Sequence, residues 1–203
     1  NRLTKNIEKI KLKKWGYVID TAHLWSSITD SDRKKGYKIE TYRGADKWIN
    51  EINENTKNKI KLIYFSTQYV YPGIKGNYRE SDPLLPANNY GWSKLGGEAA
   101  VQMYKNSLIL RLCMTEKPFT HKAAFYDAKN SFMYHDQVAA ILLKLVNAKG
   151  ILNVGGKSQS VYNFARINNP NIKKIFLKNN KKINMPMNST INREKLKKIL
   201  KNK

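Results

Sequence analysis

Short apolar runs alternate along the chain with longer segments whose apolar residues recur at helical spacing. The runs at 60–65 (IKLIYF) and 107–113 (SLILRLC) contain β-branched, leucine and aromatic residues, which is typical of strands buried inside a sheet. Between them, residues 90–104 are predicted to form a helix with Leu95, Ala99, Ala100 and Met103 available for packing. This alternation of strands and helices predicts an α/β protein.

The same pattern predicts further elements before and after this central part. Asp136 is expected to be the N-cap of a helix, which favours a structural role over a catalytic one, and we assign no acid/base role to the neighbouring His135. The other expected elements are helices at 1–14, 38–55 and around 161–165, a strand at 17–22, a strand and turn at 151–160, a helix within 131–146, a C-terminal helix within 185–200 and an irregular segment at 119–128.

The most informative stretch runs from Ile60 to Glu98. Its strand delivers two hydroxyls, Ser66 and Thr67, at the carboxyl end, which is where ligands bind in open α/β sheets. After a loop rich in Gly, Pro and Asp, Tyr90 and Lys94 follow four residues apart. A helix that begins near Tyr90 puts both side chains on one face.

These residue types point to carbonyl chemistry. A phenol has a pKa of about 10 and is a poor acid or base at neutral pH, but a nearby ammonium group favours the phenolate. A facing hydroxyl can hydrogen-bond a carbonyl oxygen and hold it against the phenol. Such a trio would protonate an alkoxide as hydride arrives, or run in reverse. Because the trio lacks a hydride carrier, the chemistry implies a nicotinamide cofactor.

The composite pattern of STQYVYPG at 66–73, NYRESDPLLP at 77–86 and YGWSKLGGE at 90–98 resembles a known family. It is similar to the extended short-chain dehydrogenase/reductases that act on nucleotide sugars, and most of all to the dTDP-4-dehydrorhamnose reductases and their sugar-nucleotide-binding relatives. A Tyr-x-x-x-Lys pair alone occurs in many chains, so the resemblance depends on the whole composite. One departure is Gln68, where these reductases usually carry Asp.

The resemblance implies a role for each matched residue. Thr67 would be the hydroxyl member of the catalytic trio, Tyr90 the acid/base and Lys94 its partner. The residues implied at the NAD or NADP site are Ala22, Phe65, Ser66, Tyr90, Lys94, Cys113 and Met114. The residues implied at the nucleotide-sugar substrate are Gln68, Tyr69, Tyr78 and Asn188. For Cys113, Tyr78 and Asn188 a plain structural role is an open alternative: core packing, fixing a loop and forming a turn, respectively.

The resemblance also implies the domain organisation. We expect a Rossmann-like, doubly wound parallel sheet with a small C-terminal substrate-binding lobe. Residues 1–115 would be the remainder of the nucleotide-binding domain with its catalytic helix, and 116–203 mostly the lobe, with segments returning to the sheet. No Gly-rich turn precedes Tyr17, so we expect an N-terminally truncated Rossmann domain that lacks the element choosing between NAD and NADP. The alternative is a family member that has lost cofactor binding.

Composition restricts the other function classes. A formal charge of +23 in 203 residues raises the question of nucleic acid, but the lysines are scattered and interleaved with Asn, so we favour solvated surfaces. The lone cysteine, Cys113, excludes an intramolecular disulfide and fits a reducing cytoplasm. The longest apolar run, VAAILLKLV, is too short for a membrane span. The three histidines show no metal-ligand spacing, so no metal site is expected.

The resemblance therefore implies an oxidoreductase of carbohydrate biosynthesis that reduces a 4-keto nucleotide-activated deoxysugar with NAD(P)H. A homodimer formed through the helix of Tyr90 and Lys94 is expected from the family. A nucleotide-sugar epimerase or dehydratase is the nearest alternative, since the same trio serves all three reactions. A dehydratase usually has an acidic pair beside the hydroxyl, where this chain has Gln68 and Tyr69. A non-catalytic sugar-nucleotide-binding or regulatory protein is the alternative from another class.

Overall fold

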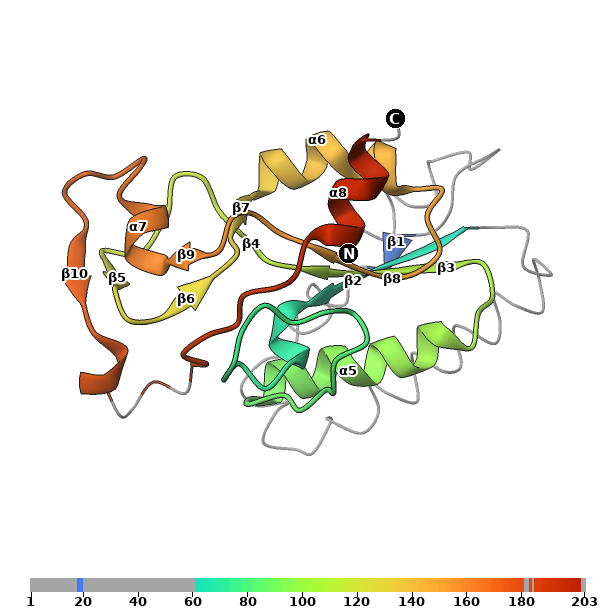
Figure 1. The fold of residues 1–203 in the computed structure, drawn as a ribbon, viewed down its shortest axis with the longest axis horizontal. Coiled ribbons are helices and arrows are strands. Elements are labelled where there is room, and N and C mark those ends of the chain that lie inside the picture. Colours follow the sequence, from blue (N-terminus) through green and yellow to red (C-terminus); the bar gives the residue numbers. More distant parts are fainter. Residues whose placement is uncertain (1–17, 20–60, 181–182, 184, 202–203) are drawn as a thin grey trace, which may run out of the picture.

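Four parallel strands form the main sheet in the part of the chain that the structure describes. The computed structural model describes residues 18–19, 61–180, 183 and 185–201 (Figure 1). The strands, in the spatial order β1-β2-β3-β8, are β1 (Val18–Ile19), β2 (Leu62–Thr67), β3 (Ser107–Leu112) and β8 (Gly150–Val154). Thr67 pairs with Leu112 and Leu112 with Val154, so the carboxyl ends of three strands lie side by side. This parallel arrangement confirms the predicted α/β class. The helices predicted at 1–14 and 38–55, and Ala22, fall outside the described residues.

Helices cover both faces of this sheet. Helix α5 (Asn89–Gln102) lies on one face, and α6 (His135–Leu145) and α8 (Glu194–Lys201) lie on the other (Figure 1). Side chains alternate between the faces along each strand, as the pleat requires. The α5 side buries Leu62, Tyr64, Ala100, Val101, Tyr104 and Ile109, and the opposite side buries Ile63, Leu108, Leu110, Leu112, Val138, Leu145, Leu152, Val154 and Leu196.

Helix α5 packs closely against β2 and the turn that follows it. Asn88 is its N-cap, and the Asn88 side chain accepts a hydrogen bond from the Gly91 amide at 2.8 Å. A Cβ atom on Gly91 would lie 2.3 Å from the carbonyl oxygen of Tyr69, and one on Gly97 would lie 2.1 Å from the hydroxyl of Tyr64. Close packing therefore explains glycines inside a helix, where they otherwise cost stability.

We predict that Gly97→Ala destabilises the protein. Overpacking against the fully buried Tyr64 ring should cost about 1–3 kcal/mol, more than alanine gains in helix propensity. Urea unfolding of the variant measures this loss. In a Tyr64→Phe background the nearest clashing atom is gone, so the same substitution should cost less. An equal loss of unfolding free energy in both backgrounds would mean that the added methyl group does not clash with the Tyr64 hydroxyl.

A smaller lobe lies at one end of the main sheet and contains three two-stranded sheets (Figure 1). Its core joins Phe119, Ala124, Ala128, Tyr134, Val161, Phe164, Ala165, Ile172 and Leu177. The strands are β4 (Met114–Thr115) with β7 (Met133–Tyr134), β5 (Ala123–Phe125) with β10 (Lys173–Ile175), and β6 (Lys129–Asn130) with β9 (Gln159–Ser160), and the lobe also holds α7 (Val161–Ala165). The proposed domain division between 115 and 116 remains a prediction.

Two local expectations were wrong. Helix α6 begins at His135 with Tyr134 as its N-cap, so Asp136 stands inside the first turn rather than at the cap. The Tyr134 amide donates to the Gln137 side chain at 2.9 Å, and the Asp136 carboxylate accepts from the Gln137 backbone amide at 2.8 Å within the first turn. The segment 119–128 is not wholly irregular, because β5 forms there by pairing with a strand about fifty residues later. A local sequence pattern does not reveal the pairing of β5 with β10, because the two strands are far apart along the chain.

Asp127 ties the lobe together through backbone hydrogen bonds. Its carboxylate accepts from the amides of Leu177 (2.6 Å) and Lys178 (3.1 Å), at the start of the 3-10 turn η2 (Leu177–Asn179). Partial burial opposes ionisation of the carboxyl, but the two backbone amides outweigh it and hold the pKa of Asp127 below its usual range.

Asp127→Asn should therefore reduce stability in a pH-dependent way. Because the folded-state pKa is depressed, the carboxylate stabilises the fold above the ordinary aspartate pKa of about 3.9, and this is lost as the pH falls through the folded-state value. We expect wild type to exceed the variant by up to about 1 kcal/mol in unfolding free energy near pH 7, as for other capping residues. Urea unfolding should show the gap closing in acid. A gap independent of pH would contradict the assignment.

Candidate active site

The three residues expected to carry the chemistry come from the end of β2 and the start of α5. Thr67 is the last residue of β2 and is buried. Its hydroxyl donates to the Gln68 side chain at 3.2 Å and accepts from the Tyr69 amide at 3.3 Å, which caps the 3-10 turn η1 (Gln68–Val70). The turn reverses the chain at the carboxyl edge of the sheet, where β3 also ends.

Lys94 is fixed against the same strand. Its side chain is only 3% exposed, and its Nζ donates to the carbonyl oxygen of Phe65 at 2.6 Å. The ammonium also lies 5.3 Å from the ring centroid of Tyr64, a cation–π distance. Lys94 is therefore held two residues from Thr67 along β2. A buried ammonium in this position is costly and calls for a reason beyond packing.

Tyr90 stands one helical turn before Lys94 on α5 and is half-buried. Its ring meets the Tyr69 ring edge-on, with centroids 6.4 Å apart. Since Tyr69 follows Thr67 by two residues, the contact places the phenol over the turn at the end of β2. The fold thus gathers Thr67, Tyr90 and Lys94 at one edge of the sheet, as their spacing predicted.

A buried ion pair lies beneath this edge. Glu98, one turn beyond Lys94 on α5, pairs with Arg111 of β3 through Nε (3.0 Å) and Nη2 (2.8 Å), and both residues are at most 1% exposed. Ser66 donates its hydroxyl to the same carboxylate at 2.5 Å. The fork-shaped guanidinium and the hydroxyl satisfy the carboxylate, as a buried charge requires.

The ion pair extends to the loop that follows η1. Arg111 Nη1 donates to the hydroxyl of Tyr71 at 2.8 Å, and that hydroxyl donates onward to the Asn153 side chain at 2.9 Å. Burial raises the pKa of Tyr71 to about 12 against the opposing effect of Arg111, so the phenol remains a donor. The Glu80 carboxylate joins the same network, because it accepts a hydrogen bond from the backbone amide of Asn153 at 2.9 Å. Sequence reasoning did not identify this network, because its members are distant along the chain.

Comparison with known proteins supports the resemblance to the nucleotide-sugar reductases. The family model described as "RmlD substrate binding domain" matches residues 29–115. A dTDP-4-dehydrorhamnose reductase from Burkholderia thailandensis is 51% identical over 41 residues, which are 20% of this chain and 14% of that protein. A probable low-salt glycan biosynthesis reductase from Haloferax volcanii is 46% identical over 56 residues, 27% of this chain and 19% of that protein. The chain thus matches less than a fifth of the length of either curated relative.

Solved structures extend the likeness to most of the chain. A hypothetical dTDP-4-dehydrorhamnose reductase from Sulfolobus tokodaii superimposes with a TM-score of 0.64 at 25% identity, over 84% of this chain and 70% of that one. A dTDP-4-dehydrorhamnose reductase from Bacillus anthracis has the same fold, with a TM-score of 0.58 at 22% identity over 68% and 57% of the two chains. These likenesses support the resemblance to the extended short-chain dehydrogenase/reductases that act on nucleotide sugars, and the solved structures show their Rossmann-like fold.

Tyr78 and Asn188, which the resemblance implies at the substrate, form hydrogen bonds within the protein. The Tyr78 hydroxyl accepts from the amides of Ile74 (2.8 Å) and Lys75 (3.1 Å), and its ring stacks on Tyr71 with centroids 4.8 Å apart. Asn188 donates to the Lys75 carbonyl at 3.0 Å and accepts from the Thr190 hydroxyl at 2.9 Å. These contacts favour the structural alternatives, loop fixing and turn formation. Their roles at the substrate remain predictions.

The other inferred residues lie along the carboxyl edge. Phe65 is half-buried and Met114 is 38% exposed at the start of the lobe. Cys113 is fully buried, and burial raises the pKa of its thiol well above the usual range, which fits a core residue. Ser66 and Gln68 are also buried, with their side chains bonded to Glu98 and Thr67. Their contacts with cofactor or substrate remain predictions.

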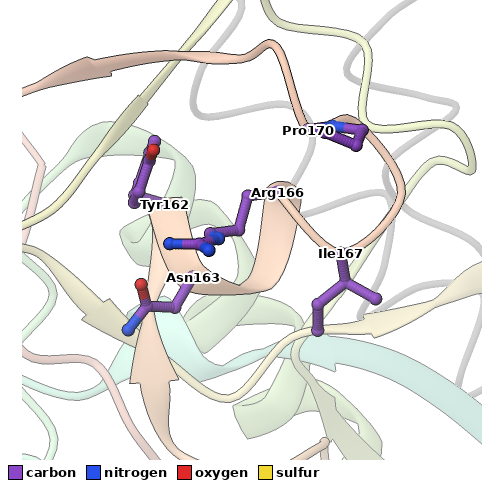
Figure 2. A pocket seen from close by; sticks show the side chains of 5 residues that line it. All are labelled: Tyr162, Asn163, Arg166, Ile167 and Pro170. Carbon is purple, nitrogen blue, oxygen red and sulfur yellow. The ribbon is translucent and has the colours of Figure 1, made fainter.

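A solvent-open cavity lies elsewhere, on the surface of the lobe around α7. Its volume is about 590 Å³, and its walls are Tyr162, Asn163, Arg166, Ile167 and Pro170 (Figure 2). The catalytic candidates do not line it. Among the described residues there is neither a cluster of three metal-ligating side chains nor a helix able to cross a membrane.

Glu98→Gln should test how much the stability of the fold depends on the buried ion pair. The substitution keeps the shape but leaves the Arg111 charge uncompensated, so we expect a loss of about 3–5 kcal/mol in unfolding free energy. The matched control is Glu194→Gln, which removes an exposed carboxylate 3.6 Å from Arg79 and should cost less than about 1 kcal/mol. Similar losses in the two variants, measured by urea unfolding, would contradict a supporting role for Glu98.

Proposed function

We propose that this chain is part of an NAD(P)-dependent oxidoreductase, which reduces the 4-keto group of a nucleotide-activated deoxysugar. The observation that carries the proposal is the buried Lys94 ammonium, fixed to the strand that ends in Thr67 and one helical turn from Tyr90. Burying a cation there is explained if it assists the neighbouring phenol. The match to the RmlD family model over this segment supports the same reaction class.

Each residue of the trio has a distinct role in the proposed reaction. Thr67 donates a hydrogen bond to the substrate carbonyl and orients it. Tyr90 donates its phenolic proton to the developing alkoxide oxygen, which becomes the product hydroxyl. Lys94 favours the resulting phenolate through its positive charge. Together they direct one proton to one oxygen.

The carboxyl edge of the sheet fits a nicotinamide cofactor. When bound, the nicotinamide supplies the hydride that the protein side chains lack. The partly exposed side chains of Phe65 and Met114 offer apolar surface at this edge, and Lys94 contributes a donor beside them. One structural neighbour is described in complex with NADP and another with NAD, so either cofactor fits the proposal. A second copy docking through α5 and a cytoplasmic location are also proposed from the family.

Binding without catalysis is the second candidate. The methionine adenosyltransferase 2 subunit beta of Pongo abelii is 52% identical over 40 residues, which are 20% of this chain. A protein named for a different reaction therefore shares part of this sequence. On this alternative the trio would be inherited structure and would bind a sugar nucleotide without turning it over.

Tyr90→Phe distinguishes the two candidates. If Tyr90 is the acid/base, its removal should lower kcat by about 10²–10⁴-fold, while nucleotide-sugar affinity stays within a few-fold. Reduction of a dTDP-linked 4-keto-6-deoxyhexose, followed by NADPH or NADH absorbance, measures the first and calorimetry the second.

Tyr162→Phe, in the lobe, is the control and should retain wild-type turnover. Full activity in Tyr90→Phe would remove the proposed acid/base. A wild-type protein that binds the sugar nucleotide but never turns it over would establish the second candidate.

A further inference from the structure

Three aromatic rings meet on the surface of the lobe beside α7. The centroid of Tyr126 lies 6.1 Å from that of Tyr162 and 5.9 Å from that of Phe176, and both contacts are edge-on. Tyr126 is 44% exposed, and the other two are half-buried. Tyr126 directly follows β5, Tyr162 belongs to α7 and Phe176 directly follows β10, so the rings come together only in the folded lobe.

Lys174 of β10 contacts all three rings. Its Nζ lies 3.8 Å from the ring centroid of Tyr126, 5.8 Å from that of Tyr162 and 5.6 Å from that of Phe176. These are cation–π distances, and such contacts are weak where water reaches them. Because Lys174 is exposed, the contacts stabilise the fold little, and the side chain can turn to an anion.

Two more cations extend the arrangement. The Arg166 guanidinium lies 5.8 Å from the centroid of Tyr162, and Lys178 Nζ lies 5.6 Å from that of Phe176. Figure 2 shows the Arg166 side chain extending toward Tyr162 and Asn163. Each cation thus contacts a ring, and each ring contacts another ring. The aromatic-basic cluster consists of Arg166, Tyr162, Lys174, Tyr126, Phe176 and Lys178.

The charge around the aromatic-basic cluster has one sign. From 137 to 193 the chain has no Asp or Glu, whereas Lys or Arg occurs ten times. Asp127 is the acidic neighbour of Tyr126, but its carboxylate is bound by the backbone amides of Leu177 at 2.6 Å and Lys178 at 3.1 Å. The surface is therefore positive and attracts an anionic partner.

We propose that the aromatic-basic cluster and the cavity beside it bind single-stranded nucleic acid. Proteins bind such strands by stacking bases on aromatic rings while Lys and Arg contact the phosphates. The cavity of about 590 Å³, whose walls include Tyr162 and Arg166, has the size of a small-ligand site and can take one nucleotide. Since it opens to solvent, the strand can continue from it to the exposed ring of Tyr126.

This inference goes beyond the proposed reaction and does not depend on it, because the catalytic candidates lie at the carboxyl edge of the main sheet. The scattered lysines of the sequence favoured solvated surfaces for the chain as a whole. The fold changes the conclusion for one region, where it places exposed rings among the cations. Charge alone attracts any polyanion, whereas exposed ring faces favour one with unpaired bases.

Fluorescence anisotropy of a labelled RNA strand tests the stacking. The full chain is titrated, at physiological salt, into a strand of about twelve nucleotides that cannot pair with itself. Tyr126→Leu keeps an apolar side chain but removes the ring face, so it should weaken binding by about 5- to 100-fold, the effect of one stacked base. Tyr126→Phe keeps the ring face and should bind like wild type.

A pair of lysine variants tests the position of the site. Lys174→Gln should weaken binding and reduce the slope of log affinity against log salt by about 0.7, the effect of one phosphate contact. Lys198→Gln removes an exposed charge from α8, on the main sheet, and should change neither quantity. Equal losses in the two variants would mean that net charge alone attracts the RNA, and would overturn the proposal. This pair decides the question even if Tyr126→Leu does not fold.

Three other results would overturn the proposal. The first is a duplex of the same length that binds as tightly as the single strand, because its base faces are covered. The second is a single nucleotide that competes as well as the whole strand, because the cavity alone would then be the site. The third is affinity weaker than about 100 μM, the weak end of non-specific binding. Tyr90→Phe should bind the strand like wild type, so this inference and the proposed function can fail separately.

Discussion

The ion pair between Glu98 and Arg111 is the contact on which the placement of the candidate catalytic residues depends. It joins α5, which carries Tyr90 and Lys94, to β3 at the centre of the sheet. Ser66 shares the carboxylate, so the strand ending in Thr67 is fixed to the same point. Because desolvated charges tolerate little displacement from their partners, the pair holds helix and strand in one register.

Close backbone packing also holds α5 against β2 and η1. At Gly91 and Gly97 the helix approaches β2 and η1 too closely for any side chain to intervene. That approach lets Lys94 reach the Phe65 carbonyl and lets the Tyr90 ring meet Tyr69. A site built this way sits on regular elements rather than on loops, which favours the constant geometry that proton transfer requires.

The lobe and the main sheet meet in a polar contact as well as an apolar one. Asn130 reaches from β6 to Cys113, which directly follows β3. Its Oδ1 also accepts from the Ser131 backbone amide at 2.9 Å, so the direction of the side chain is set. Polar groups buried at such a junction specify orientation, whereas apolar packing alone would allow the parts to slide.

The sequence by itself determined the α/β class, the strand that ends at Thr67 and the helix that carries Tyr90 and Lys94, because these depend on local periodicity and on spacing within one element. Only the tertiary structure decided what surrounds them. Arg111 meets Glu98 thirteen residues earlier, and Asn130 meets Cys113 seventeen residues earlier. No local pattern marks such pairs, since their attraction acts only after the sheet has brought their strands and helices together. For the same reason the cap of α6 fell to Tyr134 and not to Asp136: the end of β7 fixes where the helix begins.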